Sequence, residues 1–135
     1  MKPVIQQEAT GCAIAASAVL AGVNYTIAKK AAKKLGINAD DSKLWSSTIY
    51  IRRLLKHYNI KTSQTETPFK DWPSLPDRAL LASKWHKKKG IPYWHWVVFV
   101  RDATGEYVLD SKKALKQHKR TDFGRIKPKW FIALI

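Results

Sequence analysis

The chain has 135 residues, and its composition is that of a folded and strongly basic protein. A hydrophobic fraction of 45% with six Trp, five Tyr and four Phe excludes a long disordered region, because disordered chains lack the apolar mass that offsets ordering entropy. The single cysteine excludes an intramolecular disulfide and a cysteine-based zinc cluster built by this chain alone. We expect one domain over residues 1–135, with no metal ion and no cofactor.

The positive charge is the strongest compositional signal. Twenty-five Lys and Arg against ten Asp and Glu give a formal net charge of +15, which attracts polyanions such as nucleic acid, anionic lipid headgroups or acidic proteins. The run from Lys112 to Arg120 is either a solvated surface or a basic loop that faces substrate.

One apolar run near the N-terminus needs an interpretation. It extends from Ala13 to Val23 and is too short and too Ala-rich to span a bilayer. Polar residues at positions 6–8 also distinguish it from a signal peptide. We expect no membrane span, and either a cytoplasmic protein or one secreted without a recognisable signal peptide.

The first half of the chain predicts three helices. The first covers residues 11–21, ends near Gly22 and has small side chains that allow close packing. Thr26 is the expected cap of a second helix at 27–35, and the polar residues at 40–42 are expected to cap a third that runs to about Tyr58.

The second half predicts strands. An edge strand is expected at residues 60–65, then an irregular segment with three prolines, then strands at 79–85, 94–101, 106–110 and 130–135. The turn at 102–105 joins two of them as an antiparallel hairpin. This order predicts an α+β fold in which the helical N-terminal half packs on an antiparallel sheet. The segment 111–128 carries no clear pattern.

Cys12 is a candidate nucleophile because it opens a predicted helix. The amides at a helix N-terminus favour a thiolate, although an isolated free cysteine is more often a small buried apolar residue. Six residues upstream, Gln6 can bring an amide that, with the backbone N–H of Cys12, donates to an oxyanion. Gln7 is the alternative donor, and two adjacent glutamines are also commonly just solvated.

His95 and Asp110 are the candidate partners of the thiol. His95 lies near the start of an aromatic strand, and the predicted hairpin returns Asp110 beside it. A carboxylate on one ring nitrogen fixes the tautomer and leaves the other nitrogen for the thiol. Taken singly, such a histidine is more often a core residue and such an aspartate a turn former. The other histidines, His57, His86 and His118, lie among basic residues and are expected at the surface.

Three segments resemble the papain-like cysteine peptidase superfamily, most closely the leader-peptide-cleaving (double-glycine peptidase) domains of bacterial bacteriocin-exporting ABC transporters. Residues 6–13 are similar to the family's Gln-then-Cys segment, 95–100 to its His-aromatic-Val-Val strand, and 108–111 to its strand-ending Asp, with Ser111 where Pro is usual. The resemblance implies a papain-like fold. It also implies Gln6 as oxyanion donor, Cys12 as nucleophile, His95 as general base and then acid, and Asp110 as its orienter.

The function expected on these grounds is thiol-dependent hydrolysis of a peptide or isopeptide bond in a peptide or protein substrate. One alternative is a papain-like toxin or effector that acts on a macromolecule as a deamidase, acyltransferase or nuclease. Another is a non-catalytic basic module that binds nucleic acid by phosphate contacts and stacking on Trp. Most of the six tryptophans lie in apolar strand contexts, which favours core packing instead.

Overall fold

The computed structural model describes all residues from 1 to 135 and places helix α1 (Cys12–Ala21) at the centre of the helical layer. Residues 12–19 are all buried, so this helix has no solvent-facing side over most of its length. Gly22 ends it in the left-handed conformation with φ 71° and donates its N–H to the carbonyls of Ala18 and Val19. The predicted helix at residues 11–21 is confirmed.

Helix α2 (Tyr25–Lys34) starts earlier than its sequence pattern indicated. Asn24 is its N-cap, with an extended backbone and a side chain that accepts the N–H of Ile27 at 2.9 Å. The prediction of Thr26 as cap was wrong, because Asn24 supplies the oxygen that the first turn needs. Lys33 and Lys34 lie in the last turn, where positive charge is favourable.

The predicted third helix is divided in two, a 3-10 turn η1 (Ser42–Trp45) and helix α3 (Ile49–His57). The hydroxyls of the intervening residues compete for backbone groups. The Ser46 hydroxyl donates to the carbonyl of Ser42, and the Ser47 hydroxyl accepts the N–H of Ile49. Such local bonds offer the backbone an alternative to the helix, which explains why one continuous helix to Tyr58 was a wrong prediction.

Six strands form one antiparallel sheet in the order β1-β6-β2-β3-β4-β5. Their bounds are β1 (Thr67–Pro68), β2 (Arg78–Lys88), β3 (Ile91–Asp102), β4 (Gly105–Leu109), β5 (Lys119–Arg120) and β6 (Pro128–Ala133). The four strands predicted from residue 79 onward are confirmed with shifted ends. The edge strand predicted at 60–65 is present only as an isolated antiparallel bridge of Thr62 with Leu134, because Arg52 occupies the carbonyl of Ser63. The bridge is flanked by bonds from Ser63 N–H to the Ala133 carbonyl and from Ile135 N–H to the Lys61 carbonyl.

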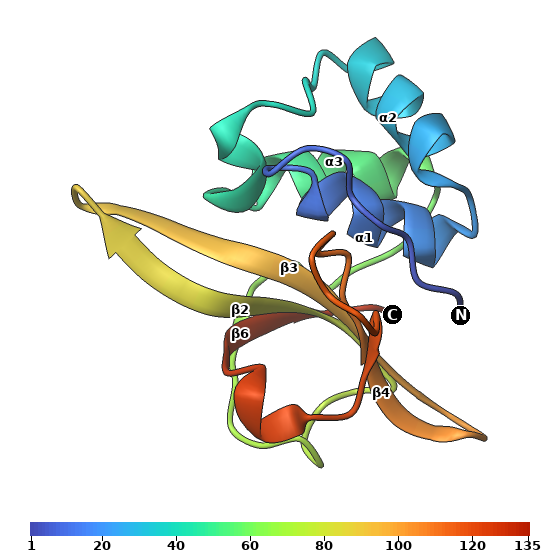
Figure 1. Cartoon of the computed structure of the whole chain (residues 1–135), viewed down its shortest axis with the longest axis vertical. Coiled ribbons are helices and arrows are strands. Elements are labelled where there is room, and N and C mark those ends of the chain that lie inside the picture. Colours follow the sequence, from blue (N-terminus) through green and yellow to red (C-terminus); the bar gives the residue numbers. More distant parts are fainter.

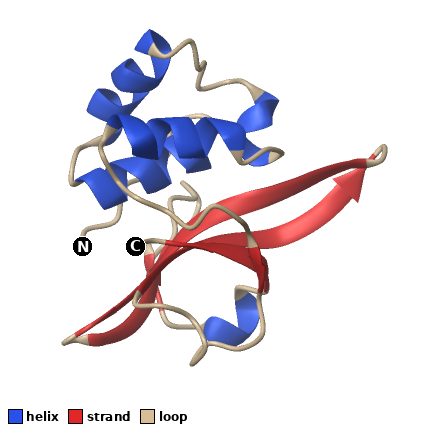
Figure 2. Cartoon of the chain, turned by 180° about the vertical axis from the view of Figure 1, so that it is seen from behind, coloured by secondary structure: helices blue, strands red, loops and turns tan.

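The three α-helices cover one face of the sheet, and the β2–β3 hairpin extends beyond them (Figure 1). The main core lies between these layers, and a second, smaller core on the other face includes Leu75, Phe99 and Ile126. The turn η2 (Phe123–Arg125) lies on that second face, apart from the helical layer (Figure 2). This arrangement confirms the α+β class with helical and sheet halves.

Trp94, Trp96 and Trp130 pack against one another edge to face, with ring centroids 4.9 to 5.6 Å apart. Trp94 and Trp96 are buried, and the indole N–H of Trp96 donates to the carbonyl of Leu44 at 3.2 Å. These rings therefore join the sheet to the helical layer.

No single helix is long and apolar enough to cross a membrane; α1 and α2 pass that test only as a pair bent by 110°.

Candidate active site

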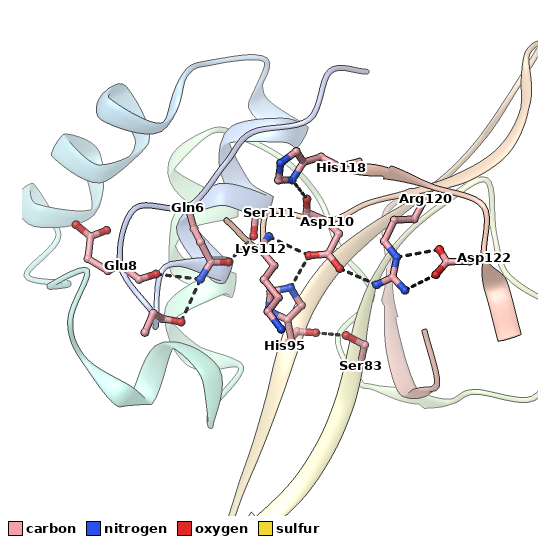
Figure 3. Close-up of polar contacts among 11 residues, drawn as sticks. Gln6, Glu8, Ser83, His95, Asp110, Ser111, Lys112, His118, Arg120 and Asp122 are labelled. Carbon is pink, nitrogen blue, oxygen red and sulfur yellow. Dashed lines mark hydrogen bonds and ion pairs between the residues drawn. The ribbon is translucent and has the colours of Figure 1, made fainter. Parts of the chain in front are cut away.

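The β3–β4 hairpin brings His95 and Asp110 together. The two strands pair from Asp102 opposite Gly105 to Val98 opposite Leu109, so Asp110 leaves the sheet next to the stretch of β3 that carries His95. The His95 ring donates its Nε2–H to Asp110 Oδ1 at 2.7 Å (Figure 3). This contact fixes the ring orientation and leaves Nδ1 as the free ring nitrogen.

Asp110 is held by more partners than the sequence indicated. Its side chain is 1% exposed; Oδ1 also accepts the backbone N–H of Lys112 at 3.0 Å, and Oδ2 accepts from Arg120 at 2.9 Å. Burial would raise the pKa of this carboxyl, but the bonds and charge of His95, with Lys112 and Arg120, hold it below its usual range. The group is therefore a carboxylate at neutral pH.

Arg120 was missed by sequence reasoning, which treated 112–120 as one basic run. The short strand β5 carries it to β4, where Arg120 pairs with Val108, and its guanidinium bridges Asp110 and Asp122. His118 was also misplaced at the surface. It is half-buried, and its Nδ1 lies 2.8 Å from the carbonyl oxygen of Asp110. The available signal was the acidic residue Asp122 close to Arg120 in an otherwise basic segment, which indicates a local ion pair.

The electrostatics of His95 favour the protonated ring. Its side chain is 14% exposed, and this burial by itself would lower the pKa. The hydrogen bond to Asp110 and the interaction with the Cys12 side chain outweigh burial and raise the pKa of His95 to about 9. A raised pKa favours the imidazolium, which the neighbouring Asp110 carboxylate stabilises.

Cys12 is the first residue of α1 and is completely buried. Gly11, the N-cap, makes no side-chain cap bond, so no side chain competes for the amides of the first turn. The Cys12 side chain is among the groups that raise the pKa of His95, so the predicted nucleophile and base lie in the same region of the fold. The sulfur is shielded from solvent in this conformation.

Gln6 lies in the same cluster but uses its amide locally. Its NH₂ group donates to the carbonyls of Glu8 at 2.9 Å and Ala9 at 3.0 Å, and its Oε1 accepts the hydroxyl of Ser111 at 2.7 Å (Figure 3). Both amide hydrogens are thus engaged in holding the turn before α1. Its role as oxyanion donor stays a prediction, and it requires one of these bonds to be released to substrate. Gln7, the alternative donor, is exposed and also lines the adjoining cleft.

Gly11 fits under Tyr25 in a space that admits no larger residue. A Cβ at this position would overlap the Tyr25 hydroxyl oxygen and lie 3.1 Å from the carbonyl oxygen of Glu8. The Tyr25 hydroxyl in turn donates to the Glu8 carboxylate, which also pairs with Lys29. The close approach of turn and helix before Cys12 therefore depends on glycine.

A cleft of about 790 Å³ opens beside this cluster. His95, Gln6 and Gln7 line it together with apolar and aromatic side chains and several lysines, whereas Cys12 lies behind its wall. The chain brings together no group of three or more His, Cys, Asp or Glu side chains of the kind that ligates a metal ion. The chemistry available from the described groups is that of a thiol, an imidazolium and a carboxylate.

Comparison with known proteins adds no relative. No family model, no curated protein and no solved structure matches this chain.

Proposed function

We propose that this protein is a papain-like, thiol-dependent hydrolase that cleaves a peptide or isopeptide bond. The observation that carries the proposal is the 2.7 Å contact of His95 Nε2 with Asp110, made by a histidine whose pKa Cys12 also raises. Sulfur, imidazole and carboxylate come from a helix start, a strand and the end of the next strand. Packing alone does not require a buried carboxylate and the only cysteine to lie close to a histidine that lines a cleft.

The reaction follows from the charges of the three groups. The Cys12 sulfur attacks the carbonyl carbon, and the proton on His95 Nδ1 passes to the leaving amine as the C–N bond breaks. Water then attacks the acyl-enzyme and gives a proton to His95, the C–S bond breaks, and the acid leaves with the thiolate and the imidazolium restored. Asp110 remains ionised and keeps the ring in place throughout. Because Cys12 is buried, the residues around it must open before a substrate carbonyl can reach the sulfur.

Alkylation of Cys12 by iodoacetamide tests the activated pair. Since the chain has one cysteine, adduct formation measured by intact mass reports Cys12 alone. We expect the rate to persist well below the pH at which an ordinary thiol ionises, and His95→Gln, which keeps the ring's volume approximately, to shift that profile upward. His57→Gln, at an exposed site on α3, is the control and should leave the profile unchanged.

Reagent access and thiol activation are separated by the shape of the profile. Slow opening lowers the rate at every pH by the same factor, whereas loss of activation moves the pH midpoint. An ordinary midpoint that is the same in wild type and His95→Gln would overturn the enzyme proposal.

Product chemistry distinguishes hydrolysis from the other reactions of such a triad. Incubation with a mixed peptide library and mass spectrometry should give shorter peptides with new termini, lost in Cys12→Ser. Deamidated or acyl-transferred products of unchanged backbone length would instead assign a deamidase or transferase. The charge of +15 favours nucleic-acid binding as a second candidate, but burial of Trp94 and Trp96 removes two of the rings that base stacking would need.

A further inference from the structure

The cleft beside His95 is lined by cations from three separate parts of the chain. Lys84 comes from β2, Lys88 and Lys89 from the tip of the β2–β3 hairpin, and Lys112 and Lys113 from the segment after Asp110. These five lysines share a concave surface, which focuses their potential more than a flat surface does.

The cleft holds almost no negative charge of its own. Glu8 is the only acidic residue that lines it, and the Glu8 carboxylate is already bound by Lys29 and the Tyr25 hydroxyl. These partners lower the pKa of Glu8, although burial opposes this effect. Glu8 is therefore ionised, and its negative charge is balanced by Lys29. The lysines of the cleft are therefore left without a carboxylate partner inside it.

Lys84 occupies a backbone conformation that L-residues seldom adopt. Its φ is 51°, at the irregularity where the register of β2 against β3 shifts between Ser83 and His86. A lysine in this left-handed region carries backbone strain that an ordinary strand conformation avoids. The bulge re-aims the side chain toward the cleft, which is the usual effect of such an irregularity.

The strained lysine also faces a like charge. Burial and the neighbouring ammonium of Lys112, opposed by Asp110, lower the pKa of Lys84. Lys84 and Lys112, which both line the cleft, thus bring two cations close together there. An anionic group placed between Lys84 and Lys112 removes their repulsion and gains charge-assisted hydrogen bonds from both.

The remaining lining fits a peptide better than a nucleic acid. Trp45, Ile91 and Tyr93 give the cleft an apolar side, and Trp45 meets Tyr93 edge-on at an interplanar angle of 78°. Two rings that meet edge-on give the cleft an apolar wall suited to an aliphatic or aromatic side chain, not a pair of parallel platforms for bases. No arginine lines the cleft, although Arg is the usual residue for bidentate phosphate recognition.

We propose that this cleft selects an acidic peptide segment, with one carboxylate bound between Lys84 and Lys112. The inference rests on the proposed function, because it names the substrate class of the same site. The carboxylate comes either from an Asp or Glu side chain or from the C-terminus of the peptide, and both present the same two oxygens to the lysines.

Binding measured on a Cys12→Ser background tests the inference without turnover. The probe is a fluorescein-labelled peptide of alternating Glu and Ala, followed by anisotropy at low and physiological salt. A matched peptide of alternating Gln and Ala is used with a free and with an amidated C-terminus, and a single-stranded oligouridine of similar length is the nucleic-acid arm. We expect the Glu peptide to bind about tenfold or more tightly than the amidated Gln peptide, which offers neither source of carboxylate.

Charge-matched variants assign the binding to the cleft. Lys112 lies in an exposed loop, so Lys112→Gln tests the proposal even if Lys84→Gln fails to fold. Each should weaken the Glu peptide about tenfold, whereas Lys34→Gln, an exposed change of the same charge on α2, should change it less than about twofold. Dependence on the free C-terminus of the Gln peptide would identify the terminal carboxylate as the bound group.

Two results would overturn the proposal: equal weakening by Lys112→Gln and Lys34→Gln, or tighter binding of oligouridine than of the Glu peptide with the same sensitivity to Lys112. The first shows only a diffuse positive field, and the second assigns the cleft to nucleic acid. Neither depends on the alkylation profile of Cys12, so failure of this inference and failure of the hydrolase proposal remain distinguishable.

Discussion

His95 and Asp110 are 15 residues apart in the chain, and their side chains meet at 2.7 Å through Nε2 and Oδ1. The carboxylate is 1% exposed and the imidazole 14%, so little water screens the pair. Such a contact is worth more than a surface ion pair because the intervening medium has a low effective dielectric constant. It is the feature from which the charge state of the whole candidate site follows.

Asp110→Asn should lower the pKa of His95 from about 9 toward or below its ordinary value of 6.5. The amide keeps the shape of the carboxylate but removes its charge, while the burial that disfavours the imidazolium remains. We expect hydrolysis or Cys12 alkylation near neutral pH to fall about a hundredfold or more. The pKa is read from the pH dependence of the His95 ring protons by NMR.

Asp122→Asn is the matched control for that change. It removes a carboxylate that also binds Arg120 but makes no contact with His95. An equal fall in the pKa of His95 in both variants would show that general charge, and not the direct contact, sets it.

Folding stability should depend on pH through His95. Its folded pKa of about 9 lies above its ordinary value of 6.5, so the stabilisation is fully present below pH 6.5 and is lost as the pH rises through 9. The loss is on the order of 3 kcal/mol. Urea unfolding at several pH values across this window should show the decline, and His95→Gln should flatten it. A decline that persists unchanged in His95→Gln would assign it to other groups.

The helix and hairpin that carry the site could be predicted because their signals are local. A small-residue helix closed by Gly22, and two apolar strands joined by the turn at 102–105, specify their structures within a few residues of sequence. The position of Cys12 at a helix start and of Asp110 beside His95 followed from these two elements.

The rest depended on contacts that no local pattern encodes. Arg120 reaches Asp110 only because a two-residue strand pairs with β4, and the surrounding segment has no hydrophobic period. The division of the third helix depends on single hydroxyls at Ser46 and Ser47, which compete with helical bonds of similar strength. The burial of Cys12 is likewise a property of the packed layers, not of residues 6–13 alone.

Arg120→Gln should destabilise the protein at acid pH. The pKa of Asp110 is below its usual value of 3.8, so this carboxylate stabilises the fold above that pH and the stabilisation is lost as the pH falls. Removing the guanidinium raises the folded pKa of Asp110, and the midpoint of acid unfolding should move to higher pH. Circular dichroism against pH measures it.

Arg125→Gln is the comparison for Arg120→Gln, since it removes the same charge from an exposed position in η2. Its acid midpoint should stay close to that of wild type. If both variants shift the midpoint equally, net charge is responsible, and the bond from Arg120 to Asp110 has no special role.

Gly11→Ala should destabilise the fold by about 1 to 3 kcal/mol, because the new methyl group overlaps the Tyr25 hydroxyl. Tyr25→Phe alone should cost about 1 kcal/mol through loss of its bond to Glu8. Since Phe removes the clashing atom, the double variant should be more stable than the sum of the two single effects predicts. Gly124→Ala, where a Cβ meets nothing within 4 Å, is the control. Chemical denaturation of the four variants measures the coupling; strict additivity of Gly11→Ala and Tyr25→Phe would contradict a clash with the hydroxyl and locate the strain in the contact with the Glu8 carbonyl instead.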